Sequence, residues 1–121
     1  MERTVLVVDD SVTMRRIVGF TLKEAGFQVI ESANGVEALR ELKYQKVDLI
    51  IADVNMPVMD GISFVREARA TAELKFVPIL MLTTESVGSR VVEGREAGAT
   101  GWMVKPFKPQ KLLETIARVL G

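Results

Sequence analysis

The sequence predicts an α/β protein built as a doubly wound open parallel sheet, (βα)5, with helices on both faces in three layers. Three apolar runs, at 4–8, 49–52 and 77–82, are short and uninterrupted, which is typical of parallel strands covered on both faces. Between the strands the apolar residues recur with a helical period instead. This alternation occurs five times, and right-handed crossovers then return every strand to one sheet.

The first two βα units occupy residues 4–42. After the strand at 4–8, Ser11 is a suitable N-cap and Gly26 ends the helix, whose predicted buried face consists of Met14, Ile17, Val18, Thr21 and Ala25. The strand at 27–31 alternates between apolar and polar residues, as a half-exposed edge strand does. Asn34 and Glu37 form a capping-box-like start for the next helix, whose predicted apolar residues are Val36, Ala38, Leu39 and Leu42.

The last three units begin with the strand at 49–52. Asp60 is expected to cap a helix that carries Phe64, Val65 and Ala68. After the strand at 77–82, Ser86 opens a helix that carries Val87, Val91 and Val92. This helix contains Gly88 and Gly94, each costing about 0.8–1 kcal/mol relative to alanine, so we expect it to be the least rigid. The strand at 101–104 has the weakest pattern, and Pro109 then starts a helix with the stripe Leu112, Leu113, Ile116, Ala117 and Leu120.

The composition excludes several classes of function. The chain has 121 residues and no cysteine or histidine, which excludes disulfides, thiolate chemistry, Ser-His-Asp triads, His-ligated zinc and a phosphohistidine on this chain. Sixteen basic and sixteen acidic residues cancel, so we expect neither nucleic acid nor an anionic membrane as a partner. No apolar run approaches the ~20 residues of a membrane span, and the N-terminus does not resemble a signal peptide. We therefore expect a single cytoplasmic domain over residues 1–121, with no effector domain.

Three carboxylates follow the ends of two predicted strands. Asp9 and Asp10 end the first strand and Asp53 ends the third, and with the strand order 2-1-3-4-5 these strands are neighbours at the switch point where such sheets bind ligands. Two like charges about 4 Å apart repel by about 4 kcal/mol at an effective dielectric constant of 20. Either Lys105, which follows the fifth strand, offsets this repulsion in a purely structural network, or a hard divalent cation does so. We predict Mg²⁺ on Asp10, Asp53, the backbone carbonyl of Asn55 and waters, with Asp9 as a ligand or as the holder of a water.

Four blocks of the sequence resemble those of response-regulator receiver domains, in the same order and at the same spacing: VLVVDDS, DVNMPVMDG, MLTTE and GWMVKPF. The resemblance covers the whole chain and is nearest to the stand-alone chemotaxis regulators of the CheY type, which share the NMP-x-MDG motif. It implies the flavodoxin-like (CheY-like) fold. It also implies a protein of two-component signal transduction that serves as a phosphoacceptor, not an enzyme acting on other substrates.

The resemblance implies a role for each residue at the strand ends. Asp53 is expected to accept a phosphoryl group from a sensor-kinase phosphohistidine, with Mg²⁺, or Mn²⁺ in its place, as the cofactor. The domain is expected to catalyse its own phosphorylation and dephosphorylation. Lys105 and Thr83 are expected to contact the phosphoryl oxygens, with a cis peptide between Lys105 and Pro106. The family's aromatic switch position falls on Trp102. Two positions that tune hydrolysis of the phosphoryl group fall on Asn55 and Glu85.

Partners and output follow from the same resemblance. We expect a CheA-like sensor histidine kinase as the phosphoryl donor. Phosphorylation is expected to change the surface of the fourth helix, fifth strand and fifth helix, which then binds a target such as a flagellar motor switch component. The chain is expected to be a monomer. Gly88 and Lys108 stand where the chemotaxis type typically has lysine and threonine, a difference that bears on the flagellar target.

Other functions stay open on the sequence alone. Within the family, a phosphorelay intermediate would pass its phosphoryl group to another histidine protein, and no residue distinguishes the two roles. A phosphatase of the haloacid-dehalogenase type needs the motif DxDx[TV], but Ser11 replaces its second aspartate. A flavodoxin-like FMN binder needs a phosphate-binding loop where Asp9 and Asp10 stand. A Ca²⁺ loop at 53–61 fails, because Pro57 and Val58 occupy positions that need a ligand and a glycine.

Overall fold

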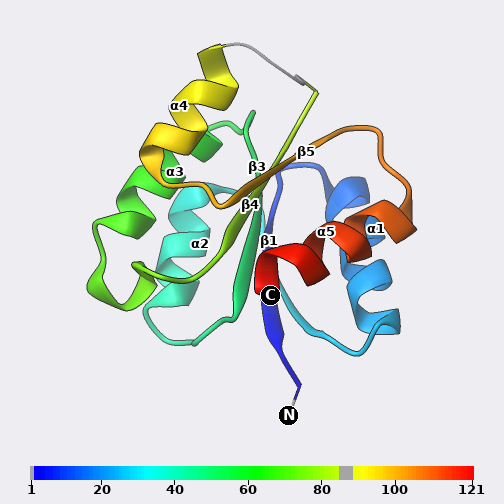
Figure 1. The fold of residues 1–121 in the computed structure, drawn as a ribbon. Helices are drawn as coiled ribbons and strands as arrows, with labels where there is room; N and C mark the ends of the chain where they lie inside the picture. The colour runs from blue at the N-terminus through cyan, green and yellow to red at the C-terminus, as the bar shows by residue number, and fades with distance from the viewer. Residues whose placement is uncertain (1, 85–88) are drawn as a thin grey trace.

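The computed structural model describes residues 2–84 and 89–121, and its five parallel strands form one sheet in the order β2-β1-β3-β4-β5 (Figure 1). The strands are β1 (Thr4–Val8), β2 (Gln28–Ser32), β3 (Leu49–Asp53), β4 (Ile79–Thr83) and β5 (Gly101–Val104). The helices are α1 (Val12–Glu24), α2 (Gly35–Leu42), α3 (Gly61–Arg69), α4 (Ser89–Ala97) and α5 (Pro109–Leu120), with a short 3-10 helix, η1 (Ala72–Leu74), before β4. Within the described ranges, no helix is both long and apolar enough to cross a lipid bilayer. The predicted fold class and strand order are confirmed.

Strand side chains alternate between two hydrophobic cores, one on each face of the sheet. Helices α1 and α5 cover one face, and α2, α3 and α4 cover the other (Figure 1). The core under α1 and α5 includes Val5, Val7, Val18, Leu22, Leu49, Ile51, Leu80, Leu82, Leu112 and Ile116. The opposite core includes Leu6, Val8, Ala38, Ile50, Ala52, Phe64, Val65, Ala68, Ile79 and Met81. Because successive residues of a strand point to opposite faces, β3 and β4 are buried along their whole length, as their uninterrupted apolar sequences indicate.

The predicted helix starts are confirmed wherever the structure describes them. Three side-chain oxygens accept a hydrogen bond from the backbone N–H three residues further on: those of Ser11 (3.2 Å), Asn34 (2.9 Å) and Asp60 (2.9 Å). Each such cap typically contributes about 1 kcal/mol. Pro109 is the first residue of α5, as predicted. The predicted start at Ser86, together with Val87 and Gly88, lies outside the described residues.

The predicted buried faces of the helices are wrong at several positions. Three residues assigned to an apolar helix face are exposed: Ile17 (49%), Ala25 and Ala117. In α1, the face that packs on the sheet contains Gly19 and Leu22 together with the predicted Val18. The apolar residues of α1 lie on two neighbouring rows, so its sequence allows more than one rotation about the helix axis. Packing against the sheet and the adjacent helix selects the rotation.

Three strands differ from their predicted bounds by one or two residues. β4 begins at Ile79 and not at residue 77, because Pro78 has no N–H to donate to a neighbouring strand. β2 is displaced by one residue, to Gln28–Ser32. β3 and β4 each extend by one residue to include Asp53 and Thr83. Two residues predicted to follow the strands are therefore part of the sheet.

Candidate functional site at the carboxyl end of the sheet

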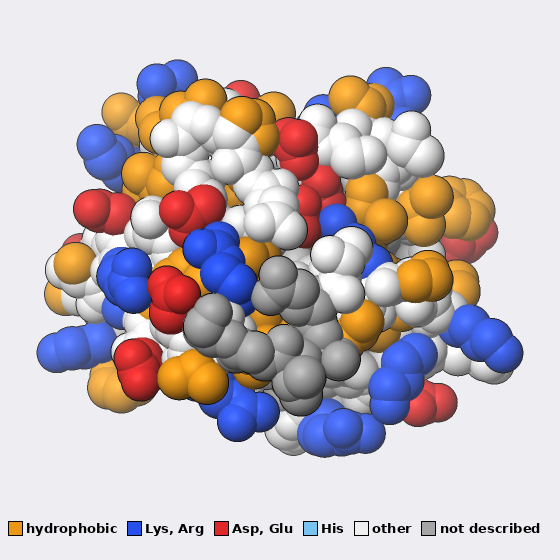
Figure 2. Space-filling model, turned by 90° about the horizontal axis from the view of Figure 1, so that it is seen from above, with side chains coloured by type: hydrophobic (Ala, Val, Ile, Leu, Met, Phe, Trp, Pro, Cys, Tyr) orange, Lys and Arg blue, Asp and Glu red, His pale blue; other side chains and the backbone are white. Residues whose placement is uncertain are grey.

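Three carboxylates converge where β1 and β3 end. These strands pair directly, Asp9 follows β1, and Asp53 is the last residue of β3. One carboxylate oxygen from each of Asp9, Asp10 and Asp53 lies within 4.8 Å of the other two. Figure 2 looks onto this end of the molecule and shows acidic side chains near the middle of the face. The structure thus brings together the three acids that the sequence placed at this switch point.

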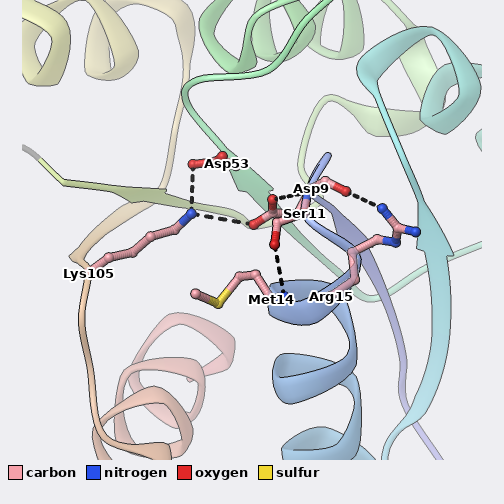
Figure 3. Close-up of polar contacts among 6 residues, drawn as sticks. All are labelled: Asp9, Ser11, Met14, Arg15, Asp53 and Lys105. Carbon is pink, nitrogen blue, oxygen red and sulfur yellow. Dashed lines mark hydrogen bonds and ion pairs between the residues drawn. The ribbon is translucent and has the colours of Figure 1, made fainter.

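Lys105 reaches this group of acids from the end of β5 (Figure 3). Its Nζ lies 3.1 Å from Asp53 Oδ1 and 3.4 Å from Asp9 Oδ2. Its backbone N–H donates to the carbonyl of Thr83 at 2.7 Å, which joins the end of β5 to the end of β4. The peptide bond between Lys105 and Pro106 is cis. One ammonium therefore faces two of three carboxylates, and the ionised cluster keeps an excess of negative charge.

Asp53 is buried among charged groups. Asp9 and Asp53 are only 1% and 6% exposed, whereas Asp10 is exposed. Burial raises the pKa of Asp53 above its ordinary value, the negative charges of Asp9 and Asp10 raise it further, and Lys105 offsets part of the rise. A carboxylate with a raised pKa is more basic and, once ionised, a better nucleophile. Positive charge beside Asp53 would favour that ionised form.

The loop after β3 returns closely to the strand end. The N–H of Gly61 donates to the carbonyl of Val54 at 2.8 Å. A Cβ on Gly61 would overlap the carbonyl oxygen of Asp53 and stand 2.8 Å from the Cα of Val54, so only glycine fits where α3 begins. Within this loop Asn55 is exposed, two residues after Asp53. Val58 is 79% exposed and has a φ of +72°, a conformation that β-branched residues rarely adopt.

The loop after β1 is held by its own residues and by the first turns of α1 (Figure 3). Asp9 Oδ1 accepts a hydrogen bond from the N–H of Ser11 at 2.9 Å, while the Ser11 hydroxyl caps α1. Arg15 donates to the backbone carbonyl of Asp9 at 2.6 Å and lies 3.4 Å from Glu31 on β2. Neither Arg15 nor Glu31 was predicted from the sequence. The available signal, a basic residue one helical turn after an acidic loop, is common on helix surfaces.

Thr83 and Trp102 lie on the two strands next to the acids. Thr83 is 1% exposed at the end of β4. Trp102 is partly buried and packs against the core on the α2–α4 side of the sheet. Its ring lies directly over Gly94 of α4, because a Cβ on Gly94 would overlap its Cζ3 and stand 3.0 Å from its Cη2. Glu85, which was predicted to tune hydrolysis, lies outside the described residues.

Sequence comparison identifies the family of this chain. Residues 5–117 match the response regulator receiver domain. The chain is 43% identical over 118 residues to the chemotaxis protein CheY1 of Helicobacter pylori, which covers 96% of this chain and 95% of that protein. It is 45% identical over 118 residues to the chemotaxis protein CheY homolog of Campylobacter jejuni, which covers 96% of this chain and 91% of that protein.

Solved structures share the fold over the full length of the chain. The chemotaxis response regulator CheY4 of Vibrio cholerae has a TM-score of 0.95 at 50% identity, covering 98% of this chain and 99% of that chain. The receiver domain of the sensor histidine kinase PA1611 from Pseudomonas aeruginosa, solved with a magnesium ion coordinated in its active-site cleft, has a TM-score of 0.92 at 30% identity, covering 100% of this chain and 99% of that chain. Because the family match and these relatives span nearly the whole chain, the protein belongs to the response regulator receiver domains, in their CheY-like branch.

Proposed function

We propose that this protein is a CheY-type response regulator of chemotaxis in which Asp53 accepts a phosphoryl group from the phosphohistidine of a CheA-like sensor kinase. The observation that carries the proposal is the position of Lys105 Nζ, 3.1 Å from Asp53 and 3.4 Å from Asp9. A phosphoryl group transferred to Asp53 would meet this fixed positive charge. The chemotaxis assignment is supported by the relatives from H. pylori, C. jejuni and V. cholerae, each of which is a chemotaxis protein.

Asp53 acts as the nucleophile in this proposal. One of its carboxylate oxygens forms a bond to phosphorus while the phosphorus–nitrogen bond of the phosphohistidine breaks, and the electron pair stays on the imidazole nitrogen. The transition state of phosphoryl transfer spreads negative charge over three oxygens, so the protein contributes mainly positioning and positive charge. Lys105 supplies a point charge and Thr83 a hydroxyl donor for these oxygens. Hydrolysis of the acyl phosphate by water, tuned by Asn55 and Glu85, would return the protein to its starting state.

Asp9, Asp10 and Asp53 would hold a divalent cation. Three carboxylate oxygens within 4.8 Å of one another are the hard oxygen donors that Mg²⁺ prefers, and the backbone carbonyl of Asn55 and waters complete the proposed set. Mn²⁺ takes the same kinds of donor and is proposed to substitute. When bound, the ion neutralises negative charge on the phosphoryl oxygens. The magnesium ion in the P. aeruginosa receiver domain supports this assignment.

The proposed output surface consists of α4, β5 and α5. Phosphorylation can shift this surface only by interacting differently with its two states. Trp102 joins two of these elements, because its ring on β5 lies over Gly94 of α4. A movement of Trp102 would therefore change the contact between α4 and the sheet. The partner on this surface is proposed to be a flagellar motor switch component, bound by the monomeric phosphorylated protein.

Phosphorylation from a small donor tests the chemistry. The protein is incubated with Mg²⁺ and acetyl phosphate, and the added phosphoryl group is followed by intact-mass spectrometry. The wild type is expected to gain one group, Asp53→Asn none, and Lys105→Ala a group at a much lower rate. Asp60→Asn is the matched control, because it changes a partly exposed carboxylate in the following loop. Phosphorylation of Asp53→Asn to the wild-type level would contradict the proposal.

The chemotaxis assignment has a separate test in the cell. A strain whose only copy of the gene carries Asp53→Asn is expected to lose chemotactic spreading in soft agar while its growth rate stays unchanged. The Asp60→Asn strain is expected to spread as the wild type does. Normal spreading of the Asp53→Asn strain would place the protein in another two-component pathway.

A further inference from the structure

We propose that Arg15 is a positioning residue that holds Asp10 in the cation site, and that Glu31 holds Arg15. The proposal rests on the proposed cation site but concerns two side chains outside its ligands. Figure 3 shows Arg15 reaching from α1 back to Asp9, on the side of Asp9 away from Lys105.

Arg15 binds the backbone of the β1–α1 loop and not one of its side chains. Its Nη1 donates to the carbonyl oxygen of Asp9 at 2.6 Å. That carbonyl belongs to the planar peptide unit that joins Asp9 to Asp10, so its direction also sets how the backbone of Asp10 leaves the end of β1. The preceding peptide is fixed as well, because the N–H of Asp9 donates to the carbonyl of Ser32 at 3.1 Å. The hydrogen bond from Arg15 thus fixes the next peptide plane, between Asp9 and Asp10.

Asp10 depends on this backbone support more than Asp9 does. The Asp9 carboxylate is buried and has partners in Ser11 and Lys105. Asp10 is exposed, and among the residues that the structure describes its side chain has no hydrogen bond or ion pair. Its carboxylate nevertheless lies within the cluster of three acids. The backbone direction at the end of β1 is therefore what places it there.

Glu31, which lies on β2, holds the guanidinium of Arg15 in place. Its Oε1 lies 3.4 Å from Arg15 Nε. Its Oε2 lies against α1 one turn further on, where a Cβ on Gly19 would stand 3.4 Å away. The Arg15 side chain is only 16% exposed. A planar guanidinium can donate to a carbonyl and face a carboxylate at once, a geometry that the point charge of lysine does not reproduce.

Positioning and simple electrostatics predict opposite effects on cation binding. Removal of a positive charge near a cation site strengthens binding of the cation by electrostatics alone. Loss of a group that orients a metal ligand weakens binding, typically by about 10- to 100-fold. The sign of the change in affinity therefore distinguishes the two roles of Arg15.

The test measures Mn²⁺ binding to the unphosphorylated protein by electron paramagnetic resonance. Arg15→Gln is expected to weaken Mn²⁺ binding by about tenfold. Arg16→Gln is the matched control, because it removes the same charge from an exposed neighbour, and it is expected to leave binding unchanged or slightly stronger. Glu31→Gln is expected to weaken binding in the wild type but to change it little in Arg15→Gln, because Glu31 acts through Arg15.

Several results would overturn the proposal. Binding by Arg15→Gln that is unchanged or tighter would do so, as would equal weakening by Arg16→Gln. If circular dichroism shows that Arg15→Gln is unfolded, Arg15→Lys replaces it, since lysine keeps the positive charge but lacks the planar guanidinium. The Arg15→Lys variant must then also bind Mn²⁺ more weakly than the wild type. Wild-type protein that binds Mn²⁺ but takes up no phosphoryl group would contradict only the proposed function, whereas wild-type protein that binds no Mn²⁺ would overturn both.

Discussion

Replacement of Gly94 by alanine tests how closely Trp102 packs on α4. A Cβ on Gly94 would overlap Cζ3 of Trp102 and stand 3.0 Å from Cη2 and 3.4 Å from Cε3. The indole is a rigid ring fixed to β5, so either the ring or the helix must move. Overpacking of this kind costs about 1–3 kcal/mol, whereas replacing glycine by alanine inside a helix gains about 0.8–1 kcal/mol. The free energy of unfolding of Gly94→Ala should therefore fall by up to about 2 kcal/mol.

Gly19→Ala is the matched control for this experiment. Gly19 also lies inside a helix, but the atom nearest to its added Cβ is Glu31 Oε2 at 3.4 Å, an ordinary van der Waals contact. This variant should gain the full helix propensity of about 0.8–1 kcal/mol. Trp102 is the only tryptophan in the sequence, so its emission in a urea titration reports both unfolding and the environment of the ring. Equal stabilisation by the two variants, with an unchanged native emission spectrum in Gly94→Ala, would refute the packing argument.

Substitutions at three further positions are expected to change stability in a direction that follows from the structure. Val58→Asn should raise the free energy of unfolding by about 1 kcal/mol in urea titrations, because Val58 is exposed at a φ of +72° that asparagine tolerates better. Asp60→Ala should lower the melting temperature through a loss of about 1 kcal/mol, whereas Asp60→Asn, which can still cap α3, should keep most of that stability. Asp53→Asn should stabilise the metal-free protein at neutral pH, because the fold raises the pKa of Asp53 and so opposes its charged form. That gain should shrink as the pH falls through the raised pKa towards the ordinary value near 4, and urea titrations at pH 7 and pH 4 should show it.

The sequence predicts most of the site formed by Asp9, Asp10, Asp53 and Lys105, because these residues stand at the carboxyl ends of strands. Asp9, Asp53 and Lys105 each follow an apolar run, and the carboxyl ends of parallel strands lie at one edge of the sheet. Strand order then decides which ends are neighbours. Arg15 and Glu31 could not be predicted in this way. Their contact depends on how α1 is rotated against β2, and the spacing of apolar residues does not fix that rotation.

The same limit explains the errors in the helix faces. In α1, Ile17 and Phe20 are 49% and 64% exposed, whereas Val18 and Leu22 are buried. All four residues are apolar, so their pattern predicts a helix without saying which of two rows contacts the sheet. Gly94 shows a related limit. Helix propensity predicts a weak position in α4, but the structure shows that the missing side chain also makes room for the ring of Trp102.

If Asp9, Asp10 and Asp53 bind a cation and Asp53 is phosphorylated, as proposed, the charges of these residues couple the two events. The cluster holds three carboxylates, of which only Asp9 and Asp53 face the one ammonium of Lys105, and burial already opposes the charge of Asp53. A phosphoryl group adds further negative charge, so it should bind more favourably when a cation is present, and by reciprocity it should tighten the binding of that cation. Arg15→Gln offers a way to see the coupling. If Arg15 acts only by placing Asp10, this variant should need more Mg²⁺ than the wild type for half-maximal phosphorylation by acetyl phosphate, yet reach the same rate at saturating Mg²⁺. A reduced rate at saturation would mean that Arg15 acts on the transfer itself and not through the cation site.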